Sequence, residues 1–452
     1  MKKIGCLFLL IFSLFACHAE DLQDHEIVIC NHSLETLDWI TDLIGCAEQS
    51  IEISAPFLGG LVGCKVLGAL EERLGQKADL QVYLLVHPIL LEEKEHKIIK
   101  RLKSAYRGNF HFMTTAEVPT IFPRVGSVNN HMKLVVVDET YYVAGGTNLD
   151  DEMCAEGTYT PPGRALLDGN AGGRDTDVVG KGALAHELRL QFHKLYAVWE
   201  HYNKHKQMIK NTESFAERNH YWDLHDGLRA QCVRFDGSEY RVVPDAIKMV
   251  FSGSMDSPNK ISKEYQRLID GAQKSLVIGN LYFHPIPDLY NALLKAVNRE
   301  IDLTLITNGT YNEISPVNNK LFVWASRINY VPLFYGRTFS FWEVFKAAGA
   351  AVKNVKIFEY YVPKILYHKK VMVVDERYLV IGSYNFGMRS NYGDYELILV
   401  MDSPELCRQE MQIFKRDLEF SKEVEPVIAR SWYFDPWISY LGGTQKQFHG
   451  FF

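Results

Sequence analysis

A pattern of His, Lys and Asp occurs twice in this chain, once in each half. The two copies are His131, Lys133, Asp138 and His368, Lys370, Asp375. Each Asp is followed, at the same distance, by a short tail that contains Gly and Asn. The tails are Gly145-Gly146-Thr147-Asn148 and Gly382-Ser383-Tyr384-Asn385. Because two long matches with the same spacing are improbable by chance, the pattern indicates a chain built from two similar halves.

The residues after each Lys predict a buried β-strand. Residues 134–137 and 371–374 are Val, Leu and Met, and such short apolar runs, rich in β-branched residues, favour a strand in the interior of a sheet. On a strand, a His and a Lys two positions apart point to the same face. We therefore expect each His–Lys pair to face one site, with the Asp at the end of the strand.

These residue types suit chemistry on a phosphodiester. Two Lys, together with Asn148 and Asn385, can neutralise the negative oxygens that would repel a nucleophile. A neutral imidazole can attack phosphorus, and a second, protonated imidazole can donate to the leaving oxygen. The doubled pattern supplies one His for each role. A metal site is disfavoured, because an ammonium group two residues from the His repels a divalent cation and attracts phosphate.

The doubled signature resembles that of the phospholipase D superfamily, in which two copies form one phosphodiesterase site. The residues Arg174-Asp175 after the first copy, and Arg389, Ser390 and Glu396 after the second, resemble the bacterial cardiolipin-synthase-like branch. One departure is Gly146, which stands where the usual tail has Ser; Ser383 occupies that place in the second copy.

The resemblance implies a role for each signature residue. It makes His131 the nucleophile and His368 the proton donor, and it implies that Asp175 and Glu396 bind substrate or support the site. It implies no cofactor and no metal. The catalytic residues that it predicts are His131, Lys133, Asp138, Asn148, His368, Lys370, Asp375, Ser383 and Asn385.

The similarity of the halves extends beyond the signature. Residues 47–51 parallel residues 272–276, and strand-like segments follow at 51–54 and 80–86 in the first half and at 276–279 and 303–307 in the second. Each half therefore predicts helix, strand, helix, strand, a further helix and strand, and then the signature strand. This alternation predicts an α/β fold. Together with the resemblance, it predicts two phospholipase-D-type α/β sandwich domains with mixed sheets and an active site at their interface.

The chain has ample length for two such domains. We place a leader at residues 1–19, a first domain at 25–205, a connector at 206–244 and a second domain at 245–445. The composition is that of a folded enzyme, with 47% hydrophobic and 23% charged residues.

Charge favours a lipid over a nucleic acid as the partner. The net charge is −6, and no stripe of Lys and Arg with interleaved aromatic residues indicates a groove for a phosphate backbone. We expect a phosphodiesterase that acts on phospholipid or at a membrane surface, with water or an alcohol as the acceptor. A nuclease of the same superfamily and a catalytically silent secreted binding protein are the alternatives. Oligomeric state is not predicted.

The N-terminus predicts export. Lys2 and Lys3 precede a run of mostly apolar residues at 4–16, which is too short to span a bilayer and is typical of a signal peptide. Cleavage after Ala19 would give a periplasmic or secreted protein, and modification of Cys17 would give a lipid-anchored one. Six further cysteines permit one or two disulfides in an oxidising compartment.

Two aromatic-rich stretches, residues 322–345 and 432–437, have two interpretations. Tyr and Trp favour a membrane interface, because one end of each ring is apolar and the other is polar. The same residues also serve as core or as the wall of a pocket.

Overall fold

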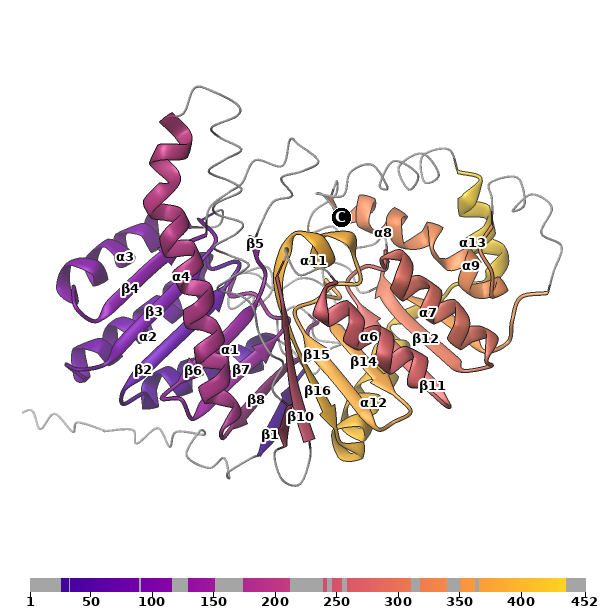
Figure 1. Ribbon diagram of the computed structural model, residues 1–452, viewed down its shortest axis with the longest axis horizontal. Helices are drawn as coiled ribbons and strands as arrows, with labels where there is room; N and C mark the ends of the chain where they lie inside the picture. The colour runs from indigo at the N-terminus through magenta and orange to yellow at the C-terminus, as the bar shows by residue number, and fades with distance from the viewer. Residues whose placement is uncertain are drawn as a thin grey trace, which may run out of the picture.

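The computed structural model shows two α/β units that lie side by side, each built on one mixed sheet (Figure 1). This is the fold class that the sequence predicts. The structure describes residues 26–31, 33–88, 91–115, 129–150, 174–211, 239–241, 246–253, 258–309, 318–339, 350–361 and 366–435. The predicted leader and most of the predicted connector lie outside these residues, and the domain boundaries stay a prediction.

The first sheet has the strand order β1-β8-β7-β6-β2-β3-β4. The neighbours β2, β3 and β4 run parallel, and the remaining pairs are antiparallel. Its strands are β1 (Ile27–Cys30), β2 (Ser50–Ala55), β3 (Gln81–Val86), β4 (Phe110–Thr114), β6 (Lys133–Val137), β7 (Tyr141–Gly145) and β8 (Asp177–Lys181).

The second sheet has the order β17-β13-β12-β11-β14-β15-β16-β10-β9, and the two-residue strand β5 (Asn129–Asn130) from the first half pairs with β16. Here β11, β12 and β13 run parallel. Its strands are β9 (Glu239–Arg241), β10 (Ala246–Ser252), β11 (Ser275–Asn280), β12 (Asp302–Asn308), β13 (Val355–Tyr360), β14 (Lys370–Val374), β15 (Tyr378–Gly382), β16 (Asp394–Asp402) and β17 (Ser421–Glu423).

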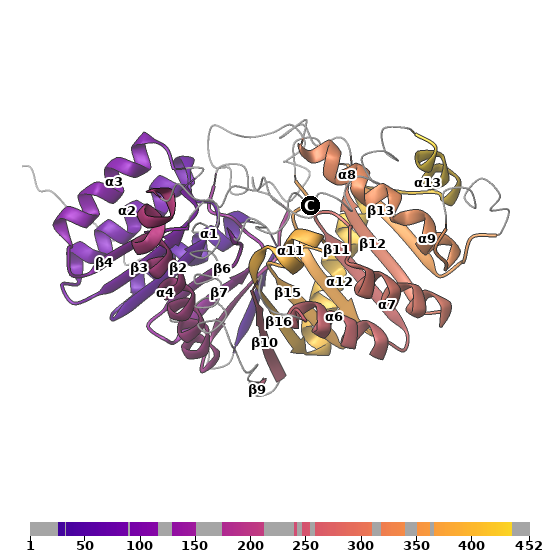
Figure 2. The same cartoon turned by 45° about the horizontal axis from the view of Figure 1, so that its top comes forward.

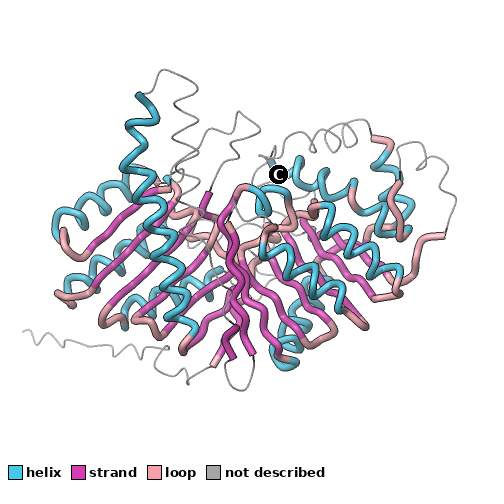
Figure 3. The backbone as a smooth tube through the Cα atoms, viewed as in Figure 1, coloured by secondary structure: helices cyan, strands magenta, loops and turns pink. Residues whose placement is uncertain are grey.

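The two sheets share one strand order, because β10-β16-β15-β14-β11-β12-β13 follows the same path as β1-β8-β7-β6-β2-β3-β4. The signature strands β6 and β14 are each flanked by the first parallel strand on one side and by the next strand of the chain on the other (Figure 3). The predicted order of elements is therefore found in both halves.

Helices cover both faces of each sheet (Figure 2). In the first half, α1 (Ser33–Cys46), α2 (Gly60–Gln76) and α3 (Glu93–Ala105) pack on one face and α4 (Leu184–Asn211) on the other. In the second half, α6 (Lys260–Gly271), α7 (Pro287–Asn298) and α9 (Tyr330–Tyr335) pack on one face and α12 (Pro404–Glu419) on the other. The remaining helices are α8 (Asn318–Ile328), α11 (Met388–Tyr392) and α13 (Pro426–Tyr433).

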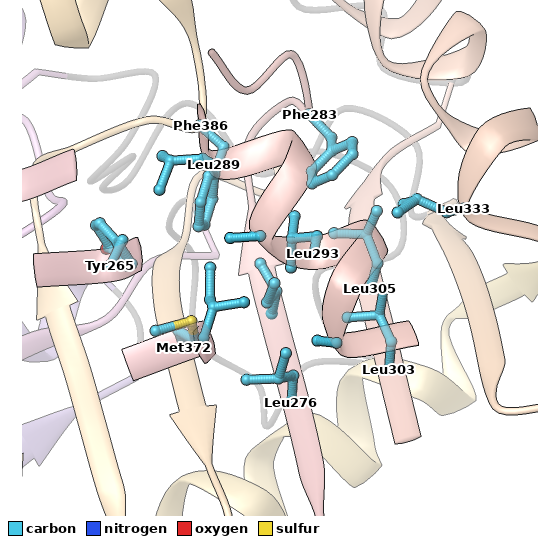
Figure 4. Close-up of a cluster of buried hydrophobic side chains, with 14 of the residues drawn as sticks. Tyr265, Leu276, Phe283, Leu289, Leu293, Leu303, Leu305, Leu333, Met372 and Phe386 are labelled. Carbon is cyan, nitrogen blue, oxygen red and sulfur yellow. The ribbon is translucent and has the colours of Figure 1, made fainter. Parts of the chain in front are cut away.

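Three buried apolar clusters stabilise this arrangement. One lies under α1–α3, and a second, under α6, α7 and α9, includes Leu276, Leu293 and Met372 (Figure 4). The third contains residues of both halves, from Phe192 of α4 to Phe414 of α12. Because burying a large apolar side chain contributes roughly 1.5–3 kcal/mol, this shared cluster holds the two sheets together where β15 lies against β7 and β8.

The described part of the first aromatic stretch belongs mainly to the core. Tyr330 and Phe334 are buried in the cluster under α6, α7 and α9, and Tyr335 and Phe339 pack against it. Trp432 of the second stretch packs against the same cluster, while the side chains of Phe341, Trp342 and Trp437 lie outside the described residues. Among the described residues, no helix combines the length and apolarity needed to cross a bilayer.

Candidate active site

Each signature histidine lies just before its strand, at the end of a short segment that reaches into the other half. Asn129 and Asn130 pair in parallel with Asp394 and Tyr395, and the amide of His131 donates to the carbonyl of Tyr395 at 3.0 Å. The second half mirrors this, because Arg174 and Tyr367 form a parallel bridge. The amide of His368 donates to the carbonyl of Arg174 at 2.8 Å.

This crossing gives each histidine a carboxylate from the opposite half. Nδ1 of His131 lies 3.0 Å from Oε1 of Glu396, and Nδ1 of His368 lies 2.6 Å from Oδ2 of Asp175. Strand register makes these two carboxylates equivalent. Asp175 lies two residues before Asp177, which pairs with Gly145, and Glu396 lies two residues before Ile398, which pairs with Gly382. Because a carboxylate only accepts, Nδ1 carries the proton and Nε2 keeps its lone pair for chemistry. The sequence assigned Asp175 and Glu396 to the site without predicting this exchange.

The two lysines occupy corresponding places but make different contacts. Nζ of Lys133 donates to the backbone carbonyl of His131 at 2.9 Å. Nζ of Lys370 donates to the carbonyl of His368 and also lies 2.7 Å from Nδ1 and 2.9 Å from Nε2 of that ring. Both side chains are buried. The two lysines therefore place positive charge beside both imidazoles, where a phosphate would sit between them.

Burial dominates the protonation of the site. It lowers the pKa of both histidines well below the ordinary value, with Lys133 acting further on His131 and Lys370 on His368. Burial likewise lowers the pKa of Lys133 to about 7 and that of Lys370 to about 8. Both imidazoles are therefore neutral at pH 7 in the site without substrate, so either one has the lone pair that a nucleophile requires.

Burial shifts the pKa values of the two carboxylates upward, in the opposite direction to those of the histidines and lysines. Burial raises the pKa of Asp175 to about 6 and that of Glu396 to about 7. The hydroxyl of Ser383 donates to Glu396, and the amide of Leu397 donates back to that hydroxyl at 3.0 Å. Ser383 thus orients the carboxylate that holds His131, so the structure brings this predicted residue beside the signature histidine, and its catalytic role stays a prediction.

Gly146 stands at the position equivalent to Ser383 for a steric reason. A Cβ at Gly146 would lie 2.0 Å from Oδ1 of Asp175, well inside van der Waals contact. The first half therefore combines Gly with the shorter carboxylate, and the second half combines Ser with the longer one. The departure from the usual tail is a consequence of Asp175 coming close to the backbone.

The two predicted asparagines lie at the same edge of the sheets as the histidines. Asn148 follows β7 and Asn385 follows β15, and both side chains are buried. The amide of Asn385 donates to Oγ of Ser390 at 3.2 Å, whereas its side-chain Oδ1 has no hydrogen-bond partner among the described residues. A buried polar atom of this kind is available to a ligand.

The structure does not bring Asp138 and Asp375 to the site, which corrects the catalytic role predicted for them. Each lies at the other end of its signature strand, roughly 20 Å from its histidine at about 3.3 Å per residue. The carboxylate of Asp138 accepts backbone amides of Glu48, Gln49 and Ser50 at 2.6–2.8 Å. Asp375 does the same for residues 273–275 at 2.7–3.0 Å. Both aspartates fix a turn.

A third acidic residue, which sequence reasoning missed, lies beside His131. Asp394 forms an ion pair with Arg389, with Nε 3.1 Å from Oδ2. His131, Asp394 and Glu396 each offer an atom within 4.8 Å of the others, which is close enough for shared metal ligation. Arg389 and Lys133 compete with a cation there, because both place positive charge against the same carboxylates.

A buried ion network behind His368 was also missed. Nε of Arg174, from the first half, lies 2.6 Å from Oδ1 of Asp417 on α12. Nζ of Lys369 lies 2.8 Å from Oε1 of Glu410 and 3.2 Å from Oδ2 of Asp417. Sequence gives little indication of such a network, because its partners are far apart along the chain and lie at no regular spacing.

Part of the chain that contains this site is similar to a known protein family. Residues 265–418 match the family model described as "Cardiolipin synthase, PLD-like domain". The match contains His368, Lys370 and Glu396. It supports a place for the chain in the phospholipase D superfamily, on the side of the cardiolipin-synthase-like proteins.

The chain is also similar in sequence to proteins named as cardiolipin synthases. The chain is 24% identical to "Cardiolipin synthase 1" of Staphylococcus epidermidis over 81% of its length, and 26% identical to "Cardiolipin synthase 2" of Bacillus cereus over 68%. It spans 61% and 49% of those two proteins. The crystal structure of phosphatidylserine synthase from Haemophilus influenzae Rd KW20 has the same fold, with a TM-score of 0.66, 15% identity and 94% of each chain covered.

Proposed function

We propose that this protein is a phospholipase-D-type phosphodiesterase that acts on phospholipid through a phosphohistidine intermediate. The observation that carries the proposal is the pair of histidines, each held by a carboxylate of the opposite half and each beside a buried lysine. The names of the relatives, which are cardiolipin synthases and a phosphatidylserine synthase, support phospholipid as the substrate class.

In the first step, His131 attacks. The lone pair of its Nε2 forms a bond to phosphorus while the bond from phosphorus to the headgroup oxygen breaks. His368 donates the proton that the leaving alcohol takes up. We assign attack to His131 because its side chain is more exposed, at 14% against 6% for His368, and because the ammonium of Lys370 lies against both ring nitrogens of His368.

In the second step, the roles of the histidines reverse. Neutral His368 takes a proton from water or from an alcohol, whose oxygen attacks phosphorus, and the bond from phosphorus to Nε2 of His131 breaks. Water gives phosphatidic acid, and an alcohol gives phosphatidyl transfer. Lys133, Lys370 and the two asparagines stabilise the negative oxygens throughout. The negative charge of a bound phosphodiester offsets the charge of the lysines, so that His368 takes up a proton from solvent at Nε2 when substrate binds and can then donate it to the leaving alcohol.

A parallel assay tests the proposal. Purified protein is incubated with labelled phosphatidylcholine vesicles, cardiolipin vesicles and DNA, each with and without excess EDTA, with His131→Ala as the inactive control. We expect lipid turnover that EDTA does not reduce, because lysines supply the charge that a metal would otherwise supply. Cleavage of DNA without lipid turnover would establish the nuclease alternative. Loss of lipid turnover in EDTA that a divalent cation restores would overturn the metal-free mechanism.

We further propose that the protein is exported. The apolar N-terminal run after Lys2 and Lys3 supports this location, as does a disulfide at Cys46, since such bonds persist in oxidising compartments. Cys30, Cys64 and Cys407 are not part of a disulfide. Expression of the full chain with a reporter enzyme that folds only outside the cytoplasm tests this location, and activity of the reporter only in the cytoplasm would overturn it.

A further inference from the structure

The two halves differ at three buried positions behind the site. Strand register makes Asp177 the equivalent of Ile398, and the signature tails make Thr147 the equivalent of Tyr384. The parallel between residues 47–51 and 272–276 makes Thr36 the equivalent of Ile261. All six side chains are buried. The first half is thus polar where the second half is apolar.

In the first half, these polar residues form one hydrogen-bonded network. Oδ2 of Asp177 accepts from Oγ1 of Thr36 at 2.7 Å and from Oγ1 of Thr147 at 2.5 Å. Oδ1 accepts from the amide of Thr147 at 3.1 Å. Ser33 at the start of α1 lies 3.2 Å from Oγ1 of Thr147. The carboxylate of Asp177 therefore ties α1 and the signature tail to β8.

A small cavity beside this network, between α1 and the sheet, reaches one of the site lysines. Thr36, Thr147, Asp177 and Lys133 all contribute to its lining. In the second half, the corresponding space holds the rings of Tyr265 and Tyr384, whose centroids are 5.5 Å apart. The polar network thus lies directly behind the site on one side only.

The network reaches His368 through the backbone. Thr147, which Asp177 holds by two hydrogen bonds, follows Gly146, and Gly146 lies so close to Asp175 that a Cβ there would be 2.0 Å from Oδ1 of that carboxylate. The amide of Gly146 is held in turn by the carbonyl of Thr176, at 3.3 Å. Asp177, the first residue of β8, also lies two residues after Asp175, and Asp175 holds Nδ1 of His368.

The carboxylate on the other side is arranged differently. Glu396 accepts from the hydroxyl of Ser383 as well as from His131, so its charge is shared between two donors. Asp175 accepts instead from the backbone amide of Thr176 at 2.9 Å and has a second carboxylate beside it. His131 also has a second carboxylate nearby, Asp394, but that one is paired with Arg389. Asp177 is held instead by the neutral groups of Thr36 and Thr147, so its negative charge is not offset by an arginine and can stabilise an imidazolium on the side of His368.

We propose that Asp177 is a positioning residue that makes the two halves of the site unequal. Through Thr147 it fixes Gly146 against Asp175, which holds the ring of His368, and its charge stands behind Asp175 where the second half has Ile398, so that protonation of the leaving group falls to His368. This proposal deepens the proposed function. The role of Asp177 in the reaction rests on that function, whereas its effect on which histidine is protonated does not.

Titratable and charged groups on several neighbouring elements also influence which histidine is protonated. Asp175 lies two residues before the start of β8, Cys30 lies on β1, Glu35 on α1, and Lys370 on β14. Lys370 and Lys133 oppose a proton on His368. A neutral residue at 177 changes one charge in this set and retains the shape of the side chain.

Nuclear magnetic resonance tests the placement without any substrate. The histidine rings are labelled with ¹³C, the signals of His131 and His368 are assigned from variants lacking each residue, and both are titrated in the wild type and in Asp177→Asn. We expect the titration of His368 to move to lower pH in the variant and that of His131 to stay. Equal movement of both signals, or movement of neither, would overturn the proposal.

A pair of substrates tests the consequence for catalysis. Asp177→Asn should slow turnover of phosphatidylcholine by about tenfold, less than the ~10²–10⁴-fold contribution of a general acid itself. It should spare an aryl phosphodiester with a nitrophenolate leaving group, which needs no proton. Thr36→Val should act in the same direction and more weakly, because it removes one of the three hydrogen bonds to Asp177.

Ile398→Val is the matched control, since it alters the equivalent buried position of the second half. It should cost stability but slow both substrates alike or neither. Equal loss of both substrates in Asp177→Asn, at temperatures where the variant is folded, would show a merely structural role and overturn the proposal. Failure of the wild type to turn over any lipid would instead count against the proposed function, and the titration of the two histidines would still test Asp177.

Discussion

Individual residues at this site are paired across the two halves. Glu396 of the second half holds His131, and Asp175 of the first half holds His368. The signature sequence correctly predicted both histidines and both lysines as neighbours of one site. It could not predict the exchange of carboxylates, because the parallel bridges that produce it involve residues more than a hundred positions apart.

The histidines should differ in the intermediate that they form. We expect His131→Ala to abolish the phosphoryl-enzyme adduct, because it removes the attacking nitrogen. We expect His368→Ala to slow formation of the adduct from natural lipid by ~10³-fold or more, since the leaving alcohol lacks its proton donor. Rapid acid quenching and mass spectrometry of the two signature peptides measure the adduct. Finding it on His368 with His131 unmodified would reverse the assignment.

The pH dependence of activity should be a narrow bell. Asp175 and Glu396 must be ionised to hold an imidazolium, so kcat/KM should rise as pH passes their pKa values of about 6 and about 7. Lys133 and Lys370 must be protonated to hold phosphate, so it should fall as pH passes about 7 and about 8. Because these groups interact, the limbs report the site as a whole. A profile that is flat through both ranges would contradict this electrostatic description.

Helices and strands were the most predictable feature of the chain. The apolar runs after Lys133 and Lys370 became β6 and β14, and the parallel segments before them became β2 and β11. The error concerned Asp138 and Asp375. The spacing along the chain indicates that both aspartates belong to the signature. It does not indicate that they lie at the end of the strand that faces away from the site. Both adopt a positive φ of 54°, which marks a turn and which no pattern of hydrophobicity indicates.

The turn role of Asp138 predicts a loss of stability without a loss of chemistry. Asp138→Ala removes the acceptor of three backbone amides and places Ala at a positive φ, so we expect a cost of about 2–3 kcal/mol. Asp138→Asn is the control, because Asn tolerates that φ and keeps one acceptor oxygen. Urea unfolding gives the stability, and kcat is measured on the folded variants. A folded Asp138→Ala protein with kcat reduced ~100-fold would restore the catalytic role.

The whole molecule depends on the contact between its halves. One apolar cluster contains residues of both sheets, and the ion pair of Arg174 with Asp417 crosses the same boundary. Both sheets have the same strand order, yet their polar interiors differ at Asp177 and Ile398. The overall fold followed from alternating elements in the sequence, whereas the boundary between the halves depends on side chains that only the folded chain brings together.

Breaking the ion pair at the boundary should reduce stability and activity together. Arg174→Met leaves Asp417 buried with Lys369 as its remaining cation, and we expect a cost of about 3 kcal/mol. Activity should fall as well, because the carbonyl of Arg174 positions His368 and its neighbour Asp175 holds the ring.

Arg189→Met is the control for this change. Arg189 bridges Glu52 and Glu139 within the first half alone, so its loss should affect thermal unfolding and leave kcat unchanged. The two variants are compared by thermal unfolding and by kcat on the same lipid. Unchanged kcat in Arg174→Met would show that the ion pair does not help to position the site.

The exchanged carboxylates also restrict how this protein can diverge. A copy of the gene that lost either half would lose a histidine together with the acid that serves the histidine it kept, so half of the chain would not retain half of the chemistry. Changes at Gly146 and Asp175 are similarly linked, because a side chain at the first requires a different acid at the second. Descendants of this chain should therefore vary these residues as pairs, and keep or lose both signatures together.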